Sequence, residues 1–287
     1  MIKQEIDNIT DISETLLIPL YARAIESKSQ NPIIYDKKAI EITDELNKIF
    51  EQSNSVLYQN LAKGKSRKRN SKKLNVAMAL RTRKFDRYCS SFLKENPGGI
   101  IVELGCGLST RCSRLDNNKM TWFDLDLPET IKIRKNFFLE TSRHKFIAKS
   151  VLDSSWTDEI PKDKKLFIIM EGLSFYLTKE ENRKVIAIIR KNFRDAEFYM
   201  EAFDPFFITM CSYIKTKDPL DKKASGLLKW GIKNGKEMET WEQDIRYIGE
   251  EAVVDKGRER FSLFNRIMFL LIPVMRKMTK IIHLKFE

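Results

Sequence analysis

Histidine, cysteine and long hydrophobic runs are all scarce in this chain of 287 residues. It has two histidines and four cysteines, with no CxxC pair, so neither a zinc site nor a disulfide framework is indicated. The longest apolar run, residues 267–275, is far shorter than the ~20 residues that span a bilayer. The first ten residues are polar and acidic, which argues against a signal peptide. We therefore expect a cytoplasmic protein with reduced thiols, no metal and no membrane insertion.

Acidic residues are outnumbered by basic ones, 40 against 52, and much of this excess is local. Seven of the eleven residues from Lys63 to Lys73 are basic, and none is aromatic. This run fits three descriptions: a solvated loop or mobile arm, a gate that attracts an anionic substrate, or a contact with nucleic acid. Proteins that bind RNA usually place aromatic side chains among the basic ones to stack on bases. Because this run has none, no nucleic-acid partner is expected.

Apolar spacing predicts helices in the first third of the chain and an alternation of strands and helices after it. Helical periodicity covers residues 12–24, 40–50 and 74–93, and the breaker sequence Asn-Pro-Gly-Gly follows at 96–99. Strands are predicted at 100–104, 121–125, 146–148, 166–170, 198–200 and 280–286, and further helices at 129–141, 179–192 and 258–272. Alternating units of this size predict a doubly wound α/β domain with a mostly parallel sheet.

We expect one domain over residues 1–287. Its predicted parts are N-terminal helices with the basic arm (1–95), a cofactor-binding core (96–204), a helical lid (205–244), and C-terminal strands with a helix (245–287). The lid is predicted because the alternation lapses between 205 and 241 into sequence of helical character, directly after a late strand.

The first predicted strand ends in a glycine-rich turn, Glu-Leu-Gly-Cys-Gly at 103–107. Glycines there let the backbone approach a ligand and adopt φ values that a Cβ forbids. Two carboxylates, Asp124 and Asp126, end the second strand 17 and 19 positions after Gly107, the spacing of an acidic group that binds ribose hydroxyls. A dinucleotide fingerprint needs a third glycine where Thr110 stands, and no P-loop is present. The turn therefore suits an adenosyl group joined to an amino acid.

These residues resemble the leucine carboxyl methyltransferase family, which includes tetracenomycin-type O-methyltransferases of polyketide synthesis. The similarity is carried by ELGCGLSTRCSRL at 103–115, WFDLDLPE at 122–129 and MEGLSFYL at 170–177. It extends to ETLLIPLYARA at 14–24, to the Arg81-Thr82 and Phe85-Asp86 pairs, and to KWGI at 229–232. The resemblance implies a Rossmann-like class I methyltransferase fold with a seven-stranded sheet, and S-adenosyl-L-methionine as the cofactor.

The resemblance also implies roles for single residues. Arg81 would pair with the methionine carboxylate of the cofactor, Gly105 would lie under the methionyl group, and Asp126 would hold the ribose. Asp124 competes with Asp126 for that role. Residues 150–153 would border the adenine, and Glu171 would lie beside the methionyl group. The expected cofactor-binding residues are Arg81, Glu103, Gly105, Gly107, Asp124, Asp126, Ser150, Val151, Leu152, Asp153, Glu171 and Gly172.

No histidine is placed to act as a general base in methyl transfer. Ligands of such sheets bind at the carboxyl ends of the strands, whereas His144 precedes the third predicted strand and His283 falls inside the last. A carboxylic acid is already ionised at pH 7, but a phenol of pKa about 10 lies roughly three pKa units, or about 4 kcal/mol, from ionisation. A carboxylate acceptor would need no base.

We therefore favour methylation of a carboxylate on an anionic, partly apolar small molecule, with a hydroxyl acceptor next. Tyr176 and Asp204 are the candidate catalytic residues, acting by positioning; Glu201 or Tyr199 could also serve as a base. The alternatives are a protein or peptide carboxyl methyltransferase and, less favoured, an RNA methyltransferase that uses the basic run. The sequence leaves the oligomeric state open.

Overall fold

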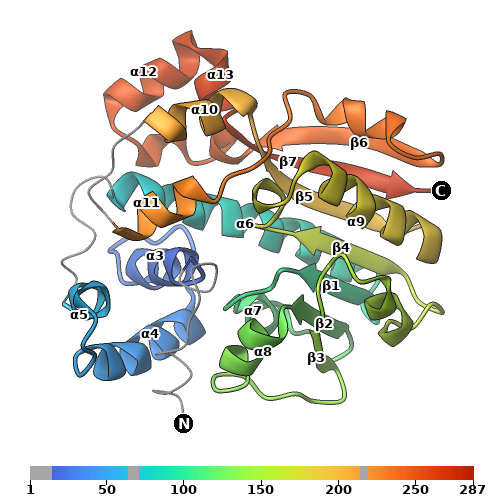
Figure 1. The fold of residues 1–287 in the computed structure, drawn as a ribbon, viewed down its shortest axis with the longest axis horizontal. Helices are drawn as coiled ribbons and strands as arrows, with labels where there is room; N and C mark the ends of the chain where they lie inside the picture. Colours follow the sequence, from blue (N-terminus) through green and yellow to red (C-terminus); the bar gives the residue numbers. More distant parts are fainter. Residues whose placement is uncertain (1–14, 64–70, 214–218) are drawn as a thin grey trace.

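The computed structural model of the chain, which describes residues 15–63, 71–213 and 219–287, is built around one seven-stranded sheet (Figure 1). The strands are β1 (Ile100–Leu104), β2 (Thr121–Asp126), β3 (His144–Ala148), β4 (Leu166–Met170), β5 (Glu197–Phe203), β6 (Ile245–Ala252) and β7 (Thr279–Phe286). Their order is β3-β2-β1-β4-β5-β7-β6. The first five are parallel, and β7 pairs antiparallel with both β5 and β6. The predicted α/β fold with a mostly parallel seven-stranded sheet is confirmed.

Burial explains which strands the sequence revealed. Every residue of β1 and of β4 is buried, so both appear as continuous apolar runs. The strand β6 was not among the apolar runs, because it forms the edge of the sheet and its sequence, IRYIGEEA, is largely polar and only partly buried.

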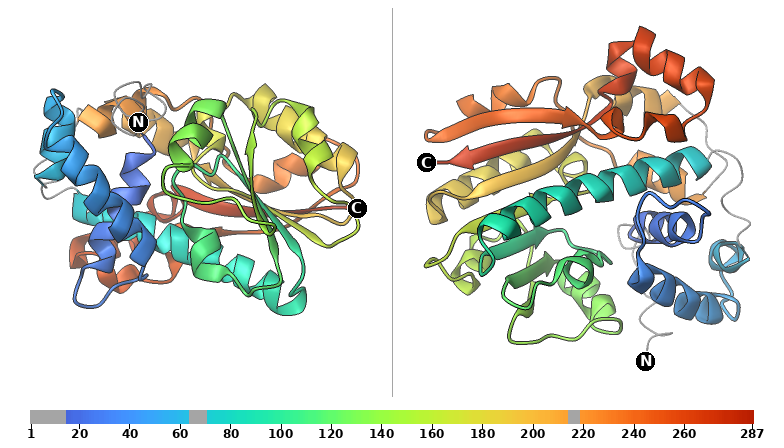
Figure 2. Two further views of the ribbon diagram at one scale, coloured as in Figure 1. Left: turned by 90° about the horizontal axis from the view of Figure 1, so that it is seen from below. Right: turned by 180° about the vertical axis from the view of Figure 1, so that it is seen from behind.

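Helices cover both faces of the sheet. The helix α6 (Ser71–Glu95) lies along one face and α9 (Lys179–Asn192) along the other (Figures 1 and 2). A capping box of Thr178 and Glu181 begins α9, and its buried isoleucines join the core between that face and the strands. On the opposite face, Phe85 and Phe92 of α6 pack against the strand residues Trp122 and Phe167.

The N-terminal helices α3 (Leu17–Ser27), α4 (Lys37–Phe50) and α5 (Val56–Ala62) form a separate layer, at the end of the molecule toward which the parallel strands point (Figure 1). They share a core with the glycine-rich turn and with α8 (Pro128–Arg134), through residues such as Leu20, Phe50 and Leu108. The basic run falls largely on residues 64–70, which lie outside the described residues. Its last lysines, Lys72 and Lys73, are exposed in the first turn of α6.

Three helix predictions are corrected by the structure. The helix predicted at 129–141 ends at Arg134, because the chain continues as tight turns that bury two phenylalanines, 137 and 138. In the tail, the predicted helix from 258 is divided: a 3-10 turn at 258–260 precedes α12 (Leu263–Leu271), which Ser262 caps, and Pro273 begins the short α13 (Pro273–Arg276). Residues 229–234 lack helical structure, and 235–240 form a 3-10 helix.

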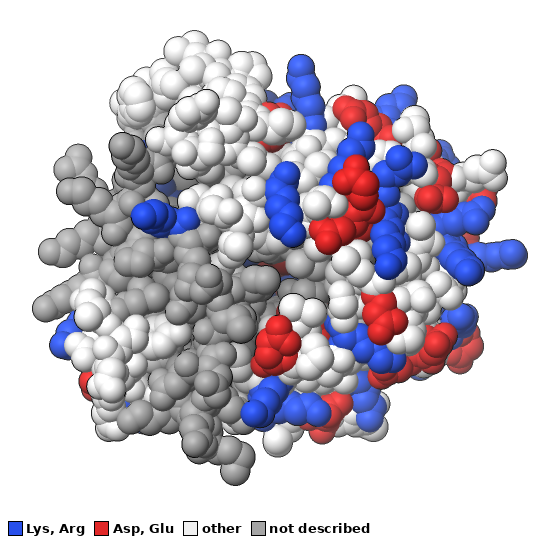
Figure 3. All heavy atoms as spheres, in the orientation of Figure 1, with Lys and Arg blue, Asp and Glu red and all other residues white. Residues whose placement is uncertain are grey.

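The segment after β5 contains α10 (Pro205–Tyr213) and α11 (Pro219–Gly226). Beyond them, Trp230 and Trp241 pack together over the α9 side of the sheet, with ring centroids 5.8 Å apart. On the side of the molecule shown in Figure 3, positively and negatively charged side chains intermingle over the half that contains the strands and α9. No helix in the described parts of the chain is long and apolar enough to cross a membrane.

Candidate active site

The glycine-rich turn after β1 is held by the end of β2. The backbone N–H groups of Gly105 and Cys106 both donate to the Leu125 carbonyl, at 2.8 and 3.1 Å. Gly105 and Gly107 have φ values of +68° and +49°, which disfavour any residue with a Cβ. Asp126 accepts a hydrogen bond from the Gly107 N–H at 2.8 Å. Asp126, at the end of β2, therefore holds the glycine-rich turn in place, although it lies 19 positions after Gly107 in the sequence.

The other candidate carboxylate, Asp124, faces a different set of partners. Its Oδ2 accepts from Arg134 Nη2 and lies 2.5 Å from His144 Nε2, while its Oδ1 accepts from Trp122 Nε1 at 2.9 Å. Burial would raise the pKa of Asp124, but the charge of Arg134 and the hydrogen bond with His144 hold it below its ordinary value. Arg134 also donates to the carbonyls of Gly107 and Ser109, at 3.0 and 2.8 Å. Asp124 thus orients an arginine that supports the turn.

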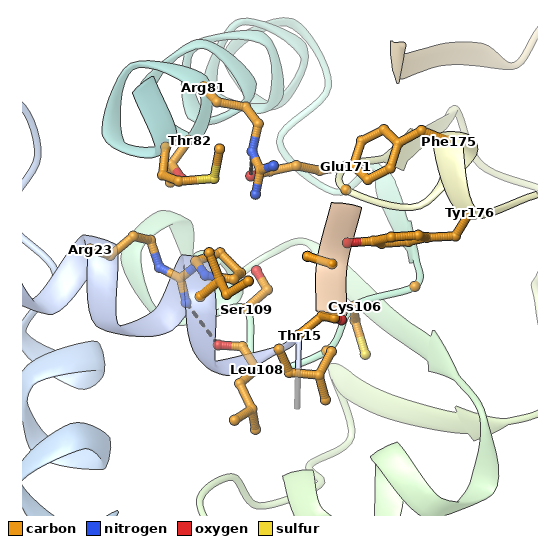
Figure 4. Close-up of a pocket in the computed structure, with 18 of the residues that line it drawn as sticks. Thr15, Arg23, Arg81, Thr82, Cys106, Leu108, Ser109, Glu171, Phe175 and Tyr176 are labelled. Atoms are coloured by element: carbon orange, nitrogen blue, oxygen red, sulfur yellow. Dashed lines mark hydrogen bonds and ion pairs between the residues drawn. The ribbon is translucent and has the colours of Figure 1, made fainter. Parts of the chain in front are cut away.

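A cavity of about 360 Å³ opens beside this turn, at the carboxyl ends of the parallel strands. The expected site residues that line it are Arg81, Glu103, Gly105, Gly107, Glu171, Gly172 and Tyr176. Arg81 reaches down from α6 toward Glu171, and the Tyr176 hydroxyl points across the cavity toward Thr15 (Figure 4). Residues separated by almost a hundred positions in the chain are brought together here.

The remaining expected residues lie outside the cavity lining. They are Asp124, Asp126, Ser150, Val151, Leu152, Asp153 and Asp204. Residues 150–153 form the turn after β3, where Asp153 caps a 3-10 helix by accepting from the Ser155 N–H at 3.0 Å. Asp204 accepts from the Phe206 N–H at 2.9 Å at the start of α10. Both aspartates thus have local structural partners.

Buried ion pairs form one wall of the cavity. Arg81 donates through Nε to Glu171 at 2.7 Å and through Nη1 to Glu201 at 3.1 Å. Arg111 lies four residues after Gly107. It donates to the other oxygen of Glu171 and to Glu103. Two arginines from separate elements therefore share one carboxylate, which fixes the positions of all three groups.

The ion pairs continue away from the cavity toward the N-terminal helices. Arg114 donates to Asp86 of α6 at 2.9 Å and to Asp36 at 2.7 Å. Asp36 also accepts from Arg23 of α3 at 2.9 Å, and Arg23 in turn donates to the Leu108 carbonyl at 2.9 Å (Figure 4). Sequence reasoning missed this extension, although the arginines at 111 and 114, just after the turn, were a usable signal.

Burial sets the ionisation of the carboxylates. It raises the pKa of Glu103 to about 7 and that of Glu201 to about 6, against the lowering effects of Arg111 and Arg81 respectively. Burial acts on Glu171 too, but the charges of its two arginines prevail and lower its pKa to about 2. Burial also raises the pKa of Tyr176 to about 12, so this phenol stays protonated near pH 7.

The rest of the cavity wall is apolar and aromatic. Phe175 and Phe203 stack with ring centroids 4.0 Å apart, and Phe207 of α10 meets Phe203 edge-on at 4.7 Å. Met78 of α6 and Leu228, which follows α11, also line the cavity. The sequence did not identify these phenylalanines and aliphatic residues as site residues, since apolar side chains near a sheet are expected to pack in a core.

The residues present fit S-adenosyl-L-methionine. The turn leaves a cavity where backbone can approach a ligand, and a Cβ on Gly105 would lie 2.9 Å from Leu173. The Nη2 group of Arg81 donates to no atom of the described residues, which leaves a cationic donor in the cavity wall for a carboxylate. The connected ion pairs contain five carboxyl groups and four arginines, so they carry no net positive charge that would repel a ligand with a sulfonium centre.

The fold and this site define a class I S-adenosyl-L-methionine-dependent methyltransferase. The sequence model of the leucine carboxyl methyltransferase family matches residues 17–190, which is more than half of the chain. The chain belongs to that family and is an O-methyltransferase that uses S-adenosyl-L-methionine. The predicted family, enzyme class and cofactor are confirmed.

Two curated relatives are similar over most of their lengths. The chain is 25% identical over 248 residues to a tetracenomycin polyketide synthesis O-methyltransferase of Streptomyces glaucescens, covering 86% of this chain and 85% of the relative. It is 27% identical over 252 residues to an S-adenosyl-L-methionine-dependent methyltransferase of Gibberella zeae, covering 83% and 81%. A solved protein of the DUF574 family from Streptomyces avermitilis shares the fold, with a TM-score of 0.53 at 10% identity over 93% of this chain and 97% of that protein.

Proposed function

We propose that this enzyme methylates a carboxylate of a partly apolar small molecule of the polyketide or other secondary-metabolite type, with a hydroxyl as the alternative acceptor. The observation that carries the proposal is the composition of the cavity wall. Stacked phenylalanines and aliphatic side chains face buried charged residues across one space. Such a cavity suits an acceptor with an apolar, planar body and a single polar reacting group. The tetracenomycin relative supports the same substrate class.

The choice of a carboxylate rests on the groups that could remove a proton. His144 is bound to Asp124, and His283 lies in β7 at 3.1 Å from Glu197; neither lines the cavity. Tyr176 has a pKa raised to about 12 by burial and stays protonated. Glu201 is occupied by Arg81 and by the Gly172 N–H at 2.8 Å. An acceptor that is already ionised needs none of these groups.

We propose that the cofactor is held by residues from both sides of the cavity. Arg81 would bind the carboxylate of the cofactor through its remaining Nη donor. At Gly105, Gly107 and Gly172, the absence of a side chain would let the cofactor lie close to the protein backbone. Asp126 would contact the ribose from the edge of the turn. When bound, S-adenosyl-L-methionine supplies an electrophilic methyl group on sulfur, so the chain's own contribution is to orient the acceptor and exclude water.

Within a single domain, the helices α10 and α11 of the predicted lid segment 205–244 are proposed to close over the cavity. Phe207 and Cys211 of α10 and Ala224 and Ser225 of α11 all line the cavity. Closing over a bound acceptor would exclude water from the reacting groups. The four free cysteines fit the cytoplasm as the compartment.

The experiment separates an ester from an ether. A cell extract is incubated with the enzyme and methyl-labelled S-adenosyl-L-methionine, and the labelled product is treated with mild alkali. A methyl ester releases labelled methanol, whereas an aryl ether or an N-methyl group retains its label. Between about pH 6 and 8, initial rates with the purified acceptor should also lack the steady rise with pH that ionisation of a phenol would give, since a carboxylate is ionised throughout that range.

Tyr176→Phe provides the matched variant. Because its phenol is protonated near neutral pH, we expect this change to raise the KM for the acceptor and to leave the shape of the pH profile unaltered. An alkali-stable label would contradict the carboxylate assignment and favour the hydroxyl. A kcat that falls and becomes strongly pH-dependent in Tyr176→Phe would show that this residue moves a proton.

A further inference from the structure

The helix α12 (Leu263–Leu271) turns its apolar face to the solvent, in contrast to an ordinary surface helix. A helix on a globular protein normally buries its apolar stripe and turns its polar face to solvent. None of the nine residues of α12 is buried, and Leu263, Phe264, Leu270 and Leu271 are each 68–73% exposed. Together with Ile267 they recur at positions i, i+1, i+4, i+7 and i+8, which places them on one face of the helix.

The opposite side of α12 attaches it to the protein. Phe269 meets Phe261 edge-on, with ring centroids 5.4 Å apart, and joins the core cluster beneath α6. Asn265 accepts a hydrogen bond from Lys73 Nζ of α6 at 3.2 Å. The outward direction of the apolar face is therefore fixed by packing and by a polar contact on the inner face. Figure 3 shows uncharged surface over this part of the molecule, in contrast to the mixed charges elsewhere on the same view.

Basic residues predominate around this face. The sequence from Phe261 to Phe286 contains no acidic residue, whereas Arg266 and Lys277 are exposed and have no ion-pair partner in the described parts of the chain. Lys72 and Lys73 are exposed beside α12 as well, at the end of the basic run. A second copy of the chain would bring Lys72, Lys73, Arg266 and Lys277 against their own counterparts, with the exposed carboxylate of Glu259 at the base of α12 to offset only part of that repulsion.

We propose that α12 and the surrounding cations form a contact surface for an anionic lipid bilayer. The residues of this lipid-contact surface are Lys72, Lys73, Leu263, Phe264, Arg266, Ile267, Leu270, Leu271 and Lys277. An amphipathic helix that lies in the plane of the interface inserts its apolar face among the acyl chains, while flanking lysines and arginines bind acidic headgroups. At nine residues, α12 is far too short to span a bilayer and is suited to this in-plane contact.

The position of the surface relates it to the cavity. Leu74 and Met78, which line the cavity, follow Lys73 on α6 by one and five residues. At about 1.5 Å per residue, Met78 lies roughly 7.5 Å along the helix from the proposed contact. An enzyme held at the membrane by α12 would thus keep one wall of its cavity close to apolar molecules dissolved in the lipid.

The test is co-sedimentation of the full chain with vesicles. One set contains phosphatidylcholine alone, and the other contains about a quarter phosphatidylglycerol to supply negative surface charge. We expect binding to the anionic vesicles, weakened by raised salt because the electrostatic part is screened. The variant Leu270→Ser/Leu271→Ser should bind at least tenfold more weakly. Leu139→Ser, which changes a leucine that is 83% exposed elsewhere, should bind like the wild type.

Further measurements assign the two parts of the surface. Arg266→Gln/Lys277→Gln should lower affinity for anionic vesicles and reduce its salt dependence, whereas Lys236→Gln, at an exposed lysine of the 3-10 helix 235–240, should not. Methyl transfer in vesicle-free solution should be unchanged in all four variants, which confirms that they fold. Absence of vesicle binding by the wild type, or an equal loss in Leu139→Ser, would overturn the proposal. So would self-association in analytical ultracentrifugation that Leu270→Ser/Leu271→Ser abolishes, since the face would then join two copies.

Discussion

Replacing Arg81 with methionine tests whether the buried ion pairs both hold the site and bind the cofactor. Arg81 is 6% exposed and is the arginine shared by Glu171 and Glu201. Methionine fills much of the same space but removes the charge and the donors. Glu171 keeps its second partner, Arg111. Glu201, which is fully buried, loses the only arginine with which it forms an ion pair among the described residues, and therefore bears most of the cost.

The expected loss follows from that geometry. Removing one partner of a buried ion pair usually costs about 3–5 kcal/mol, because the other charge is left without compensation. Arg87→Met is the matched control on the same helix. Arg87 also pairs with a glutamate, Glu251, at 2.6 Å, but its side chain is 39% exposed, and exposed pairs contribute about 0–1 kcal/mol.

The loss should depend on pH, with a sign fixed by Glu201. Burial already raises its pKa to about 6, above the ordinary glutamate value of 4.5, and loss of Arg81 removes the main cause that lowers it. A group whose pKa is raised by folding binds its proton more tightly in the native state, so it costs stability as the pH rises. The deficit of Arg81→Met should therefore be larger at pH 8 than at pH 5.5.

The assay is urea unfolding at both pH values, together with calorimetric titration of S-adenosylhomocysteine. Adding Glu201→Gln to Arg81→Met removes the uncompensated charge and should restore most of the stability. Affinity should stay at least tenfold below wild type in the single and the double variant, since a charged hydrogen bond to the cofactor is absent in both. A pH-independent loss below about 1 kcal/mol would refute the electrostatic argument. Affinity restored in the double variant would show that Arg81 supports the site without touching the cofactor.

Two further predictions concern the turn. Gly105→Ala should weaken S-adenosylhomocysteine binding at least tenfold, because the φ of Gly105 is +68° and a leucine side chain occupies the place that a Cβ would take. The control Gly98→Ala, whose added Cβ would meet nothing within 4 Å, should bind the ligand normally. Equal affinities of the two variants would contradict the role of the turn. Asp126→Ala should weaken the same ligand by about 1–3 kcal/mol, while Asp124→Ala should mainly lower the free energy of unfolding, because it leaves buried Arg134 without its carboxylate. Reversed effects in calorimetry and urea unfolding would assign the ribose to Asp124.

The sequence alone was enough for the features that depend on neighbouring residues. Apolar runs at 100–104 and 166–170 predicted strands because both are buried on each face. Glycine spacing in the 103–107 turn indicated a ligand loop, because positive φ values are a property of single residues. The edge strand β6 was the exception, since one that is half exposed carries too little hydrophobic pattern to stand out.

Only the tertiary structure decided between residues that local patterns treat alike. Asp124 and Asp126 lie two positions apart on one strand and so face the same side of the sheet; Arg134 takes one of them and the Gly107 N–H the other. The sharing of Glu171 by two arginines required contacts across 60 and 90 positions. Helical periodicity likewise shows that α12 is amphipathic but not which way it faces. That direction is set by two contacts on the inner side of α12. Asn265 binds Lys73, which is distant in the sequence, and Phe269 packs against Phe261.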